Sequence, residues 1–205
     1  IARSGARRQA ATIATEALLA GHQPQWIISA GFAGGLDDRL NRYDLVIADR
    51  VKDTAGNELA LDIQIDPAAL AQLPQVHVGR LLSADRVVRS PQEKRALGES
   101  HQALAVDMET LAVAEVCRRR QVPFLAVRVI IDAVDDRLPS DVDYLLKQKT
   151  QAARLGAAFG ALLNRPGSLK DLLKLKEQAL LASDRLAKFL LSVIQAIAPL
   201  SNQSS

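Results

Sequence analysis

Long apolar runs mark the candidate strands of this chain. Residues 124–131 form a continuous β-branched run bounded by turn-forming residues, which is typical of a strand buried on both faces of a parallel sheet. Residues 25–30 form a second buried run, and residues 44–51 and 76–82 predict two further strands. A shorter apolar run leads into Asp107. The pattern therefore predicts a largely buried sheet.

Helical periodicity separates these runs. Apolar residues on one face predict a helix that begins at Ala6 and ends before Gly21, and a second helix follows Glu109 and ends in three arginines, where a helix C-terminus favours cations. Ser90-Pro91-Gln92-Glu93 is a capping box with proline at the first helical position, so a third helix follows to about Gly98. We expect this third helix to have a structural role only.

The C-terminal part of the chain is also helical in pattern. Small residues between Ala152 and Leu163 predict a helix that packs closely on a sheet, and residues 164–167 break it. Ser168 then caps a long amphipathic segment. Alternating strands and helices predict an α/β fold. We divide the chain into a domain at residues 1–164 and an amphipathic helical extension at residues 165–205.

The extension has two interpretations, because lysines accompany its leucines. A helix of this kind could lie on a membrane surface and receive a lipid substrate. The apolar stripe favours the other interpretation, in which the helix or a hairpin docks on its own domain or on a dimer partner. The lysines are Lys170, Lys174, Lys176 and Lys188.

Composition narrows the class of protein. The chain has 205 residues, of which 48% are apolar and 3% aromatic, and this suits aliphatic packing of helices on a sheet in one sizeable core. The net charge is +3 and the basic residues are scattered, so nucleic acid is not indicated as a partner. A single Cys117 cannot form an internal disulfide, and the sequence shows no signal-peptide pattern, transmembrane span or metal-ligand spacing. We expect a cytoplasmic protein without a metal.

Two carboxylates stand where a ligand is expected to bind. Glu109 closely follows the run that ends at Asp107, and Asp132 directly follows the run at residues 124–131. In open α/β sheets, ligands bind outside the carboxyl ends of the strands. Either carboxylate could instead serve the structure alone, with Glu109 capping its helix and Asp132 opening a turn.

A glycine-rich segment, residues 31–35, follows the strand predicted at residues 25–30. Glycine tolerates a positive φ and lets the backbone approach a ligand closely. We therefore expect a turn here that lines a nucleoside or phosphate site.

Three blocks of sequence resemble one family when they are taken together. They are IISAGFAGGLDDRLNRYDLVIADRV (27–51), GRLLSADRVVRSP (79–91) and VDMET…VPFLAVRVIIDAVDD (106–136). In this order and spacing they resemble the purine nucleoside phosphorylase / methylthioadenosine–adenosylhomocysteine nucleosidase superfamily, over about residues 5–163. The start of the C-terminal extension, RPGSL, is similar to the hopanoid-associated branch of that superfamily.

The resemblance implies a three-layer α/β/α phosphorylase/nucleosidase-like fold with a mixed central sheet, assembled as a homodimer. In this family two or three strands precede the point at which the chain begins. We therefore expect N-terminal strands to be missing, together with the acid that activates water in the hydrolytic members. No cofactor is implied, although phosphate is a co-substrate in the phosphorolytic members.

The resemblance also implies a reaction, the cleavage of a purine N-glycosidic bond. Asp132 would donate a proton to the leaving base, since burial can keep a carboxyl protonated. Glu109 would accept hydrogen bonds from the ribose hydroxyls, and its charge would favour an oxocarbenium-like transition state. The substrate-binding positions carried over from the family are Phe32, Ala33, Val87, Val88, Met108 and Glu109.

The positions expected to hold phosphate depart from the family pattern. Ser29 and Phe32 stand where phosphorolytic members carry an arginine and a serine. Because a bound phosphate needs a cationic clamp, this departure favours hydrolysis. Arg3, Arg7 and Arg8 could form a substitute anion site at a helix N-terminus, or they could be solvated on a first helical turn.

A third departure lies next to the catalytic aspartate of the family. Ile131 replaces a serine there, and together with Phe32 and Val87 it makes the predicted pocket more apolar. This could raise the pKa of Asp132 or leave its carboxyl misaligned. Hydrolysis of adenosine or a 5′-substituted adenosine therefore has two alternatives: release of adenine from an adenosyl-hopanoid, and a nucleoside-binding protein without catalysis.

Overall fold

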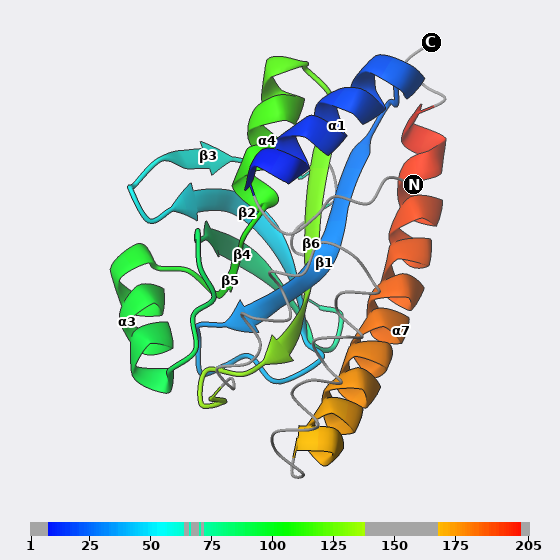
Figure 1. The fold of residues 1–205 in the computed structure, drawn as a ribbon. Helices are drawn as coiled ribbons and strands as arrows, with labels where there is room; N and C mark the ends of the chain where they lie inside the picture. The colour runs from blue at the N-terminus through cyan, green and yellow to red at the C-terminus, as the bar shows by residue number, and fades with distance from the viewer. Residues whose placement is uncertain (1–7, 64–65, 67–69, 71, 138–167, 202–205) are drawn as a thin grey trace.

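The computed structural model describes residues 8–63, 66, 70, 72–137 and 168–201 (Figure 1). The strands are β1 (Ile27–Gly35), β2 (Leu45–Asp53), β3 (Glu58–Ala60), β4 (Val76–Ser83), β5 (Ala105–Asp107) and β6 (Phe124–Asp132). The helices are α1 (Arg8–His22), α3 (Pro91–His101), α4 (Thr110–Arg119) and α7 (Ser168–Ser201). The helix predicted at residues 152–163 lies outside the described residues.

The central sheet is mixed, as the sequence analysis predicts. Its strand order is β3-β2-β4-β5-β1-β6, and β6 also pairs with β2, so the sheet closes back on itself. The β1–β6, β2–β4 and β4–β5 pairs are parallel, and the other three pairs are antiparallel. Parallel pairing sets Gly34 opposite Asp132 and Ser83 opposite Asp107. Two paired strand ends therefore each carry a carboxylate.

The glycine-rich segment is strand and not turn, which corrects the expectation for residues 31–35. β1 continues to Gly35 because its backbone pairs with β6 along its length and with β5 at its end. Among the described glycines only Gly56 has a positive φ. The close approach at Gly34 is to a side chain of the protein, since a Cβ there would lie 3.1 Å from Oδ2 of Asp132. Glycine here makes room for a carboxylate of the protein itself.

Helices cover each face of the sheet (Figure 1). Apolar side chains pack on both faces beneath them. Phe124 and Ile130 of β6 belong to the core that α1 and α4 cover. Leu125 and Val127 belong to the core on the opposite face, which α7 covers. Because successive strand residues point to opposite faces, a strand between two helical layers is apolar throughout.

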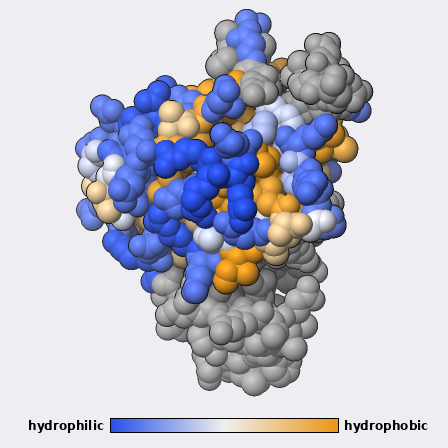
Figure 2. Space-filling model, turned by 90° about the horizontal axis from the view of Figure 1, so that it is seen from above, coloured by the Kyte–Doolittle hydropathy of each residue, from blue (hydrophilic) through white to orange (hydrophobic). Residues whose placement is uncertain are grey.

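The C-terminal helix α7 docks on the sheet of its own chain. Ala182, Leu186 and Val193 are buried in the core cluster on the face that this helix covers, where α7 contacts β6 and β1, while Leu180 and Leu191 point to solvent. Seen from above, the described surface is mainly hydrophilic, with smaller hydrophobic patches (Figure 2). Among the described residues, no helix combines the length and the apolarity needed to span a membrane.

Because α7 docks on the sheet, two leucines of this helix should contribute differently to the free energy of unfolding. Leu186 is 8% exposed and Leu191 is 62% exposed. Leu186→Ala should lower the free energy of unfolding by about 2 kcal/mol or more, because it leaves a cavity against the sheet. The matched variant Leu191→Ala should change it by about 0.5 kcal/mol or less. Urea titration followed by circular dichroism measures both, and equal losses would contradict the docking.

Candidate active site

Asp132, the last residue of β6, is paired with a lysine in the protein interior. Asp132 is 3% exposed, and Lys94 of α3 is 0% exposed. Oδ2 of Asp132 lies 2.5 Å from Nζ of Lys94. Lys94 also donates hydrogen bonds to the carbonyl oxygens of Ala133, at 2.7 Å, and Asp136, at 2.9 Å. Asp132 therefore does more than open a turn, because it forms a buried ion pair with a helix.

Opposing effects set the pKa of Asp132. Burial raises the pKa, because a carboxylate loses its hydration in the interior. The positive charge of Lys94 lowers it, the carboxylate of Asp136 raises it, and Arg42 lowers it. Burial prevails, so the pKa of Asp132 lies above its usual value.

Cations from other segments hold the turn after β6, residues 132–136. Nε of Arg42 lies 2.7 Å from Oδ2 of Asp136. Arg95 of α3 contacts the carboxylate of Asp135. These contacts hold the outer part of the turn, whereas the buried lysine contacts the carboxyl at its start.

Glu109 lies half-buried between β5 and α4, and its side chain does not cap that helix. Glu109 occupies the N-cap position of α4, but the side chain that bonds the start of the helix is that of Asp107, whose Oδ2 accepts a hydrogen bond of 3.1 Å from the backbone N–H of Thr110. The side chain of Glu109 therefore takes no part in capping the helix. Its carboxyl makes no hydrogen bond or ion pair within the described part of the chain.

The surroundings of Glu109 bring its pKa close to neutral pH. Burial and the negative charge of Asp107 raise the pKa of Glu109 to about 7, and Arg128 opposes this rise. A carboxyl of this kind exchanges its proton near neutral pH, and its ionised form can accept hydrogen bonds from the hydroxyls of a ligand.

A buried ion pair joins the central strands. Nε of Arg128 lies 2.9 Å from Oδ2 of Asp107, and both side chains are almost fully buried. The other guanidinium nitrogens donate to the carbonyl and hydroxyl oxygens of Ser29, at 2.8 and 2.9 Å, and to Oγ1 of Thr110, at 2.6 Å. Ser83 donates to the second oxygen of Asp107 at 2.9 Å. The network ties β1, β4, β5, β6 and α4 together.

Arg8 is not available to bind an anion, which corrects one expectation. It contacts Asp53 at 3.4 Å and Glu115 at 3.1 Å, so it is neither solvated alone nor a free phosphate ligand. Arg3 and Arg7, the other two candidates for a substitute anion site, lie outside the described residues.

The other predicted site residues have different surroundings. Phe32 is 41% exposed, whereas Ala33 and Val88 are buried in core clusters. Val87 and Met108 are half-buried. Contact of these five residues with a substrate stays a prediction.

Phe32 and Ile131, two positions that depart from the family pattern, lie on the opposite face of the sheet from the buried Arg128. Phe32 pairs with Val129, whose face of the sheet packs against α7, and Ile131 packs on that same face. Arg128 pairs with Gly31 and points to the face that α4 covers. The structure therefore brings Gly34 and Asp132 together but sets Phe32 and Ile131 on the α7 side.

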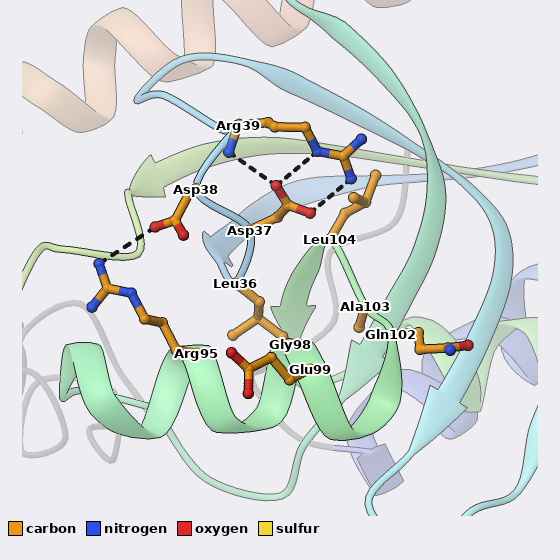
Figure 3. Close-up of a pocket in the computed structure, with 10 residues that line it drawn as sticks. All are labelled: Leu36, Asp37, Asp38, Arg39, Arg95, Gly98, Glu99, Gln102, Ala103 and Leu104. Carbon is orange, nitrogen blue, oxygen red and sulfur yellow. Dashed lines mark hydrogen bonds and ion pairs between the residues drawn. The ribbon is translucent and has the colours of Figure 1, made fainter.

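A surface pocket of about 450 Å³ is lined by none of the predicted site residues (Figure 3). It lies between the segment after β1 and α3, with Arg39 folded over Asp37. Arg39 donates hydrogen bonds of 2.8 and 2.7 Å to the two oxygens of Asp37, which lowers the pKa of that carboxyl. Asp37 is therefore held in an ion pair with Arg39 at this surface.

Cysteine and metal chemistry find little support in the described chain. Cys117 is buried in α4, and burial raises the pKa of its thiol to about 11, so the thiol stays protonated at neutral pH. In the described ranges, no three His, Cys, Asp or Glu side chains are grouped to hold a metal ion.

Sequence analysis missed Lys94, because the capping box at Ser90 gave α3 a structural role only. A signal was present in the sequence. Lys94 stands near the start of a helix, where the helix dipole disfavours a cation, and three residues before Leu97 on the inner face. Both features indicate a specific anion as partner.

Comparison with known proteins links the chain to one family. A family model described as "Phosphorylase superfamily" matches residues 1–164. A 5′-methylthioadenosine/S-adenosylhomocysteine nucleosidase of Tolumonas auensis is 28% identical over 169 residues, which are 72% of this chain and 74% of the relative. The protein of the same name from Shewanella oneidensis is 30% identical over 170 residues, 72% of each chain.

Solved structures share the fold. The 5′-methylthioadenosine/S-adenosylhomocysteine nucleosidase of Neisseria meningitidis, in complex with methylthio-immucillin-A, superimposes with a TM-score of 0.58 at 24% identity and covers 75% of this chain and 77% of its own. The futalosine hydrolase of Helicobacter pylori gives 0.58 at 23% identity, with 76% and 74% covered. The α/β fold class is confirmed.

The buried network predicts a large loss of stability when its cation is removed. Arg128→Met leaves Asp107 without its counter-charge, so the free energy of unfolding should fall by about 3 kcal/mol or more. Arg39→Met breaks an exposed pair with Asp37 and should cost about 1 kcal/mol or less. Urea titrations of both variants measure these losses. Similar values would contradict the prediction that the buried Arg128–Asp107 pair stabilises the fold more than the exposed Arg39–Asp37 pair.

Glu109 should make stability depend on pH. Its pKa rises from an ordinary 4.5 to about 7 on folding, so between these values the folded protein keeps a proton that the unfolded chain has lost. Stability should therefore fall as the pH rises through this window. Glu109→Gln should raise the melting temperature relative to wild type most at pH 8 and least at pH 4. A difference that is the same at both pH values would contradict the raised pKa.

Proposed function

Because this chain belongs to the phosphorylase superfamily, we propose that it hydrolyses the N-glycosidic bond of adenosine or a 5′-substituted adenosine. The nucleosidase names of the Tolumonas and Shewanella relatives support this substrate class. The observation that carries the proposal is the buried carboxyl of Asp132, which has a raised pKa at the end of a central strand.

Asp132 has the properties of a general acid. Breaking the bond leaves negative charge on the base and positive charge on the ribose, so a proton given to the base lowers the barrier. A raised pKa makes the carboxyl of Asp132 easier to protonate than an ordinary aspartate, which suits a proton donor. General acid catalysis of this kind contributes about 10²- to 10⁴-fold to the rate.

Glu109 has the properties of an acceptor for the ribose. Its carboxyl is half-buried and engages no described side chain, so a ligand hydroxyl can use it. Its pKa of about 7 allows the ionised form at neutral pH, and hydrogen bonds from two hydroxyls would favour that form further. The negative charge would stabilise the developing positive charge of the ribose.

Hydrolysis is favoured over phosphorolysis by the arginines near β1. Phosphate binding needs a cation with free donors. Arg128 donates to Asp107 and to Ser29, and Arg8 is shared between two carboxylates. We therefore propose water as the second substrate, with no cofactor.

Proposals for the oligomeric state, the localisation and the partners rest on the family resemblance and on composition. We propose a homodimer in the cytoplasm, with no nucleic-acid partner. The named relatives give no support to adenine release from an adenosyl-hopanoid. A binding protein without catalysis differs in one measurable respect, since it would bind a nucleoside without releasing the base.

Base release by the full-length protein tests the proposal. Adenosine, 5′-methylthioadenosine and S-adenosylhomocysteine are incubated with and without phosphate, and free adenine is measured. Adenine should be released equally in both conditions. Asp132→Asn should lower kcat by about 10²-fold or more, because the proton donor is lost. The control Asp38→Asn removes an exposed carboxylate and should stay within about twofold of wild type.

Two results would decide against the proposal. Nucleoside binding without any base release would leave a binding protein on this fold. Release that requires phosphate would assign phosphorolysis instead. Full activity in a folded Asp132→Asn variant would be consistent with the proposed reaction but would show that Asp132 is not its general acid.

A further inference from the structure

Lys94 is a fully buried cation in an unfavourable place. It stands close to the N-terminus of α3, after the cap Ser90 and the first helical residue Pro91. The helix dipole places positive charge at this end, so a cation here is disfavoured. A buried charge also costs free energy unless it is paired. A side chain with 0% exposure at this position therefore needs strong compensation from its neighbours.

The compensation comes entirely from the turn after β6. Three oxygens surround Nζ of Lys94: Oδ2 of Asp132 at 2.5 Å and the carbonyl oxygens of Ala133 and Asp136 at 2.7 and 2.9 Å. An ammonium has three donors and no acceptor, so this environment matches its capacity. Oδ2 makes no hydrogen bond of regular geometry within the described chain, so its contact with Lys94 is an ion pair.

The other charges that face Asp132 largely cancel each other. Asp136 on the same turn and Arg42 on the segment before β2 lie 2.7 Å apart and form their own ion pair. Arg95, the next residue of α3, contacts Asp38 and Asp135 instead. Among the described residues, Lys94 is therefore the cation whose charge acts mainly on Asp132.

We propose that Lys94 is a positioning residue for the acid Asp132, which it holds by Oδ2 so that Oδ1 is the oxygen that gives its proton to the base. The inference rests on the proposed function, in which Asp132 protonates the leaving base. The two carbonyl contacts fix the ammonium, and the ammonium in turn fixes the carboxyl. α3 thereby has a role in the reaction and not in the architecture alone.

The charges balance through the step. As the bond from ribose to base breaks, its electron pair goes to the base, and the proton of Asp132 passes to a ring nitrogen of the base. The ribose then takes up water, which releases a proton to solvent. Asp132 is left as a carboxylate beside an ammonium. Lys94 therefore stabilises the product of proton transfer more than the starting acid, which is the requirement for catalysis.

Removing the ammonium should weaken the acid. Lys94→Met keeps the length of the side chain and removes the charge, so the pKa of Asp132 should rise by about one unit or more. The pKa is measured by NMR titration of carboxyl-labelled aspartate, and the Asp132 signal is identified by its absence from Asp132→Asn. The alkaline limb of the kcat profile should move up by the same amount, with kcat about tenfold lower at the optimum and KM little changed.

Arg95→Met is the matched control, because it removes the neighbouring cation of α3 from the same turn. Its Asp132 titration and its pH profile should match wild type. Lys94→Gln keeps a donor for the carbonyl oxygens without the charge, and it replaces Lys94→Met if that variant does not fold. A merely structural lysine would lower the melting temperature and kcat without moving the titration or the alkaline limb.

An unmoved Asp132 titration in a folded Lys94 variant overturns the proposal. Equal shifts in the Lys94 and Arg95 variants also overturn it, since the effect would then be general. The NMR titration needs no substrate. A wild-type protein that releases no base but shows the Lys94-dependent shift would therefore reject the proposed function and leave the Lys94–Asp132 coupling in place.

Discussion

The ion pair between Arg128 and Asp107 is the contact on which the centre of this fold depends. Two opposite charges inside a sheet are tolerated only when every donor and acceptor around them is used. Here Ser29, Ser83 and Thr110 supply the remaining partners, and each comes from a different element. The same contacts that satisfy the charges also fix the order of the strands. The candidate site is built on this fixed frame.

The pair also explains why two carboxylates only two residues apart differ in their chemistry. Both carboxylate oxygens of Asp107 accept hydrogen bonds, from Arg128, from Ser83 and from the backbone at the start of α4. Glu109 lies beside this charge without a partner of its own, so burial and repulsion from Asp107 raise its pKa to about 7. One carboxylate is structural because it is paired, and the other is available because it is not.

Sequence reasoning succeeds here where the signal is local. The continuous run of β6 and the capping box at Ser90 predict elements that the structure contains, because apolar periodicity and capping are properties of neighbouring residues. Sequence reasoning fails where contacts between distant segments decide the structure. The glycines of residues 31–35 extend β1 because β5 and β6 bind them, and Lys94 is buried because a distant turn supplies its oxygens. Neither partner is visible within a sequence window.

Asp132 and Glu109 both have raised pKa values, but the proposed reaction needs them in opposite protonation states. A bound nucleoside would favour the required state of each. The reaction that we propose needs Asp132 protonated and Glu109 ionised at the same pH. Ribose hydroxyls that donate to Glu109 would favour its ionised form and lower its pKa. A base that covers Asp132 would exclude water and raise the pKa of that carboxyl, while Lys94 keeps the acid strong enough to give up its proton. The substrate would thus drive the two pKa values apart in the productive direction, while Lys94 opposes the rise at Asp132 and stabilises the carboxylate that proton transfer leaves.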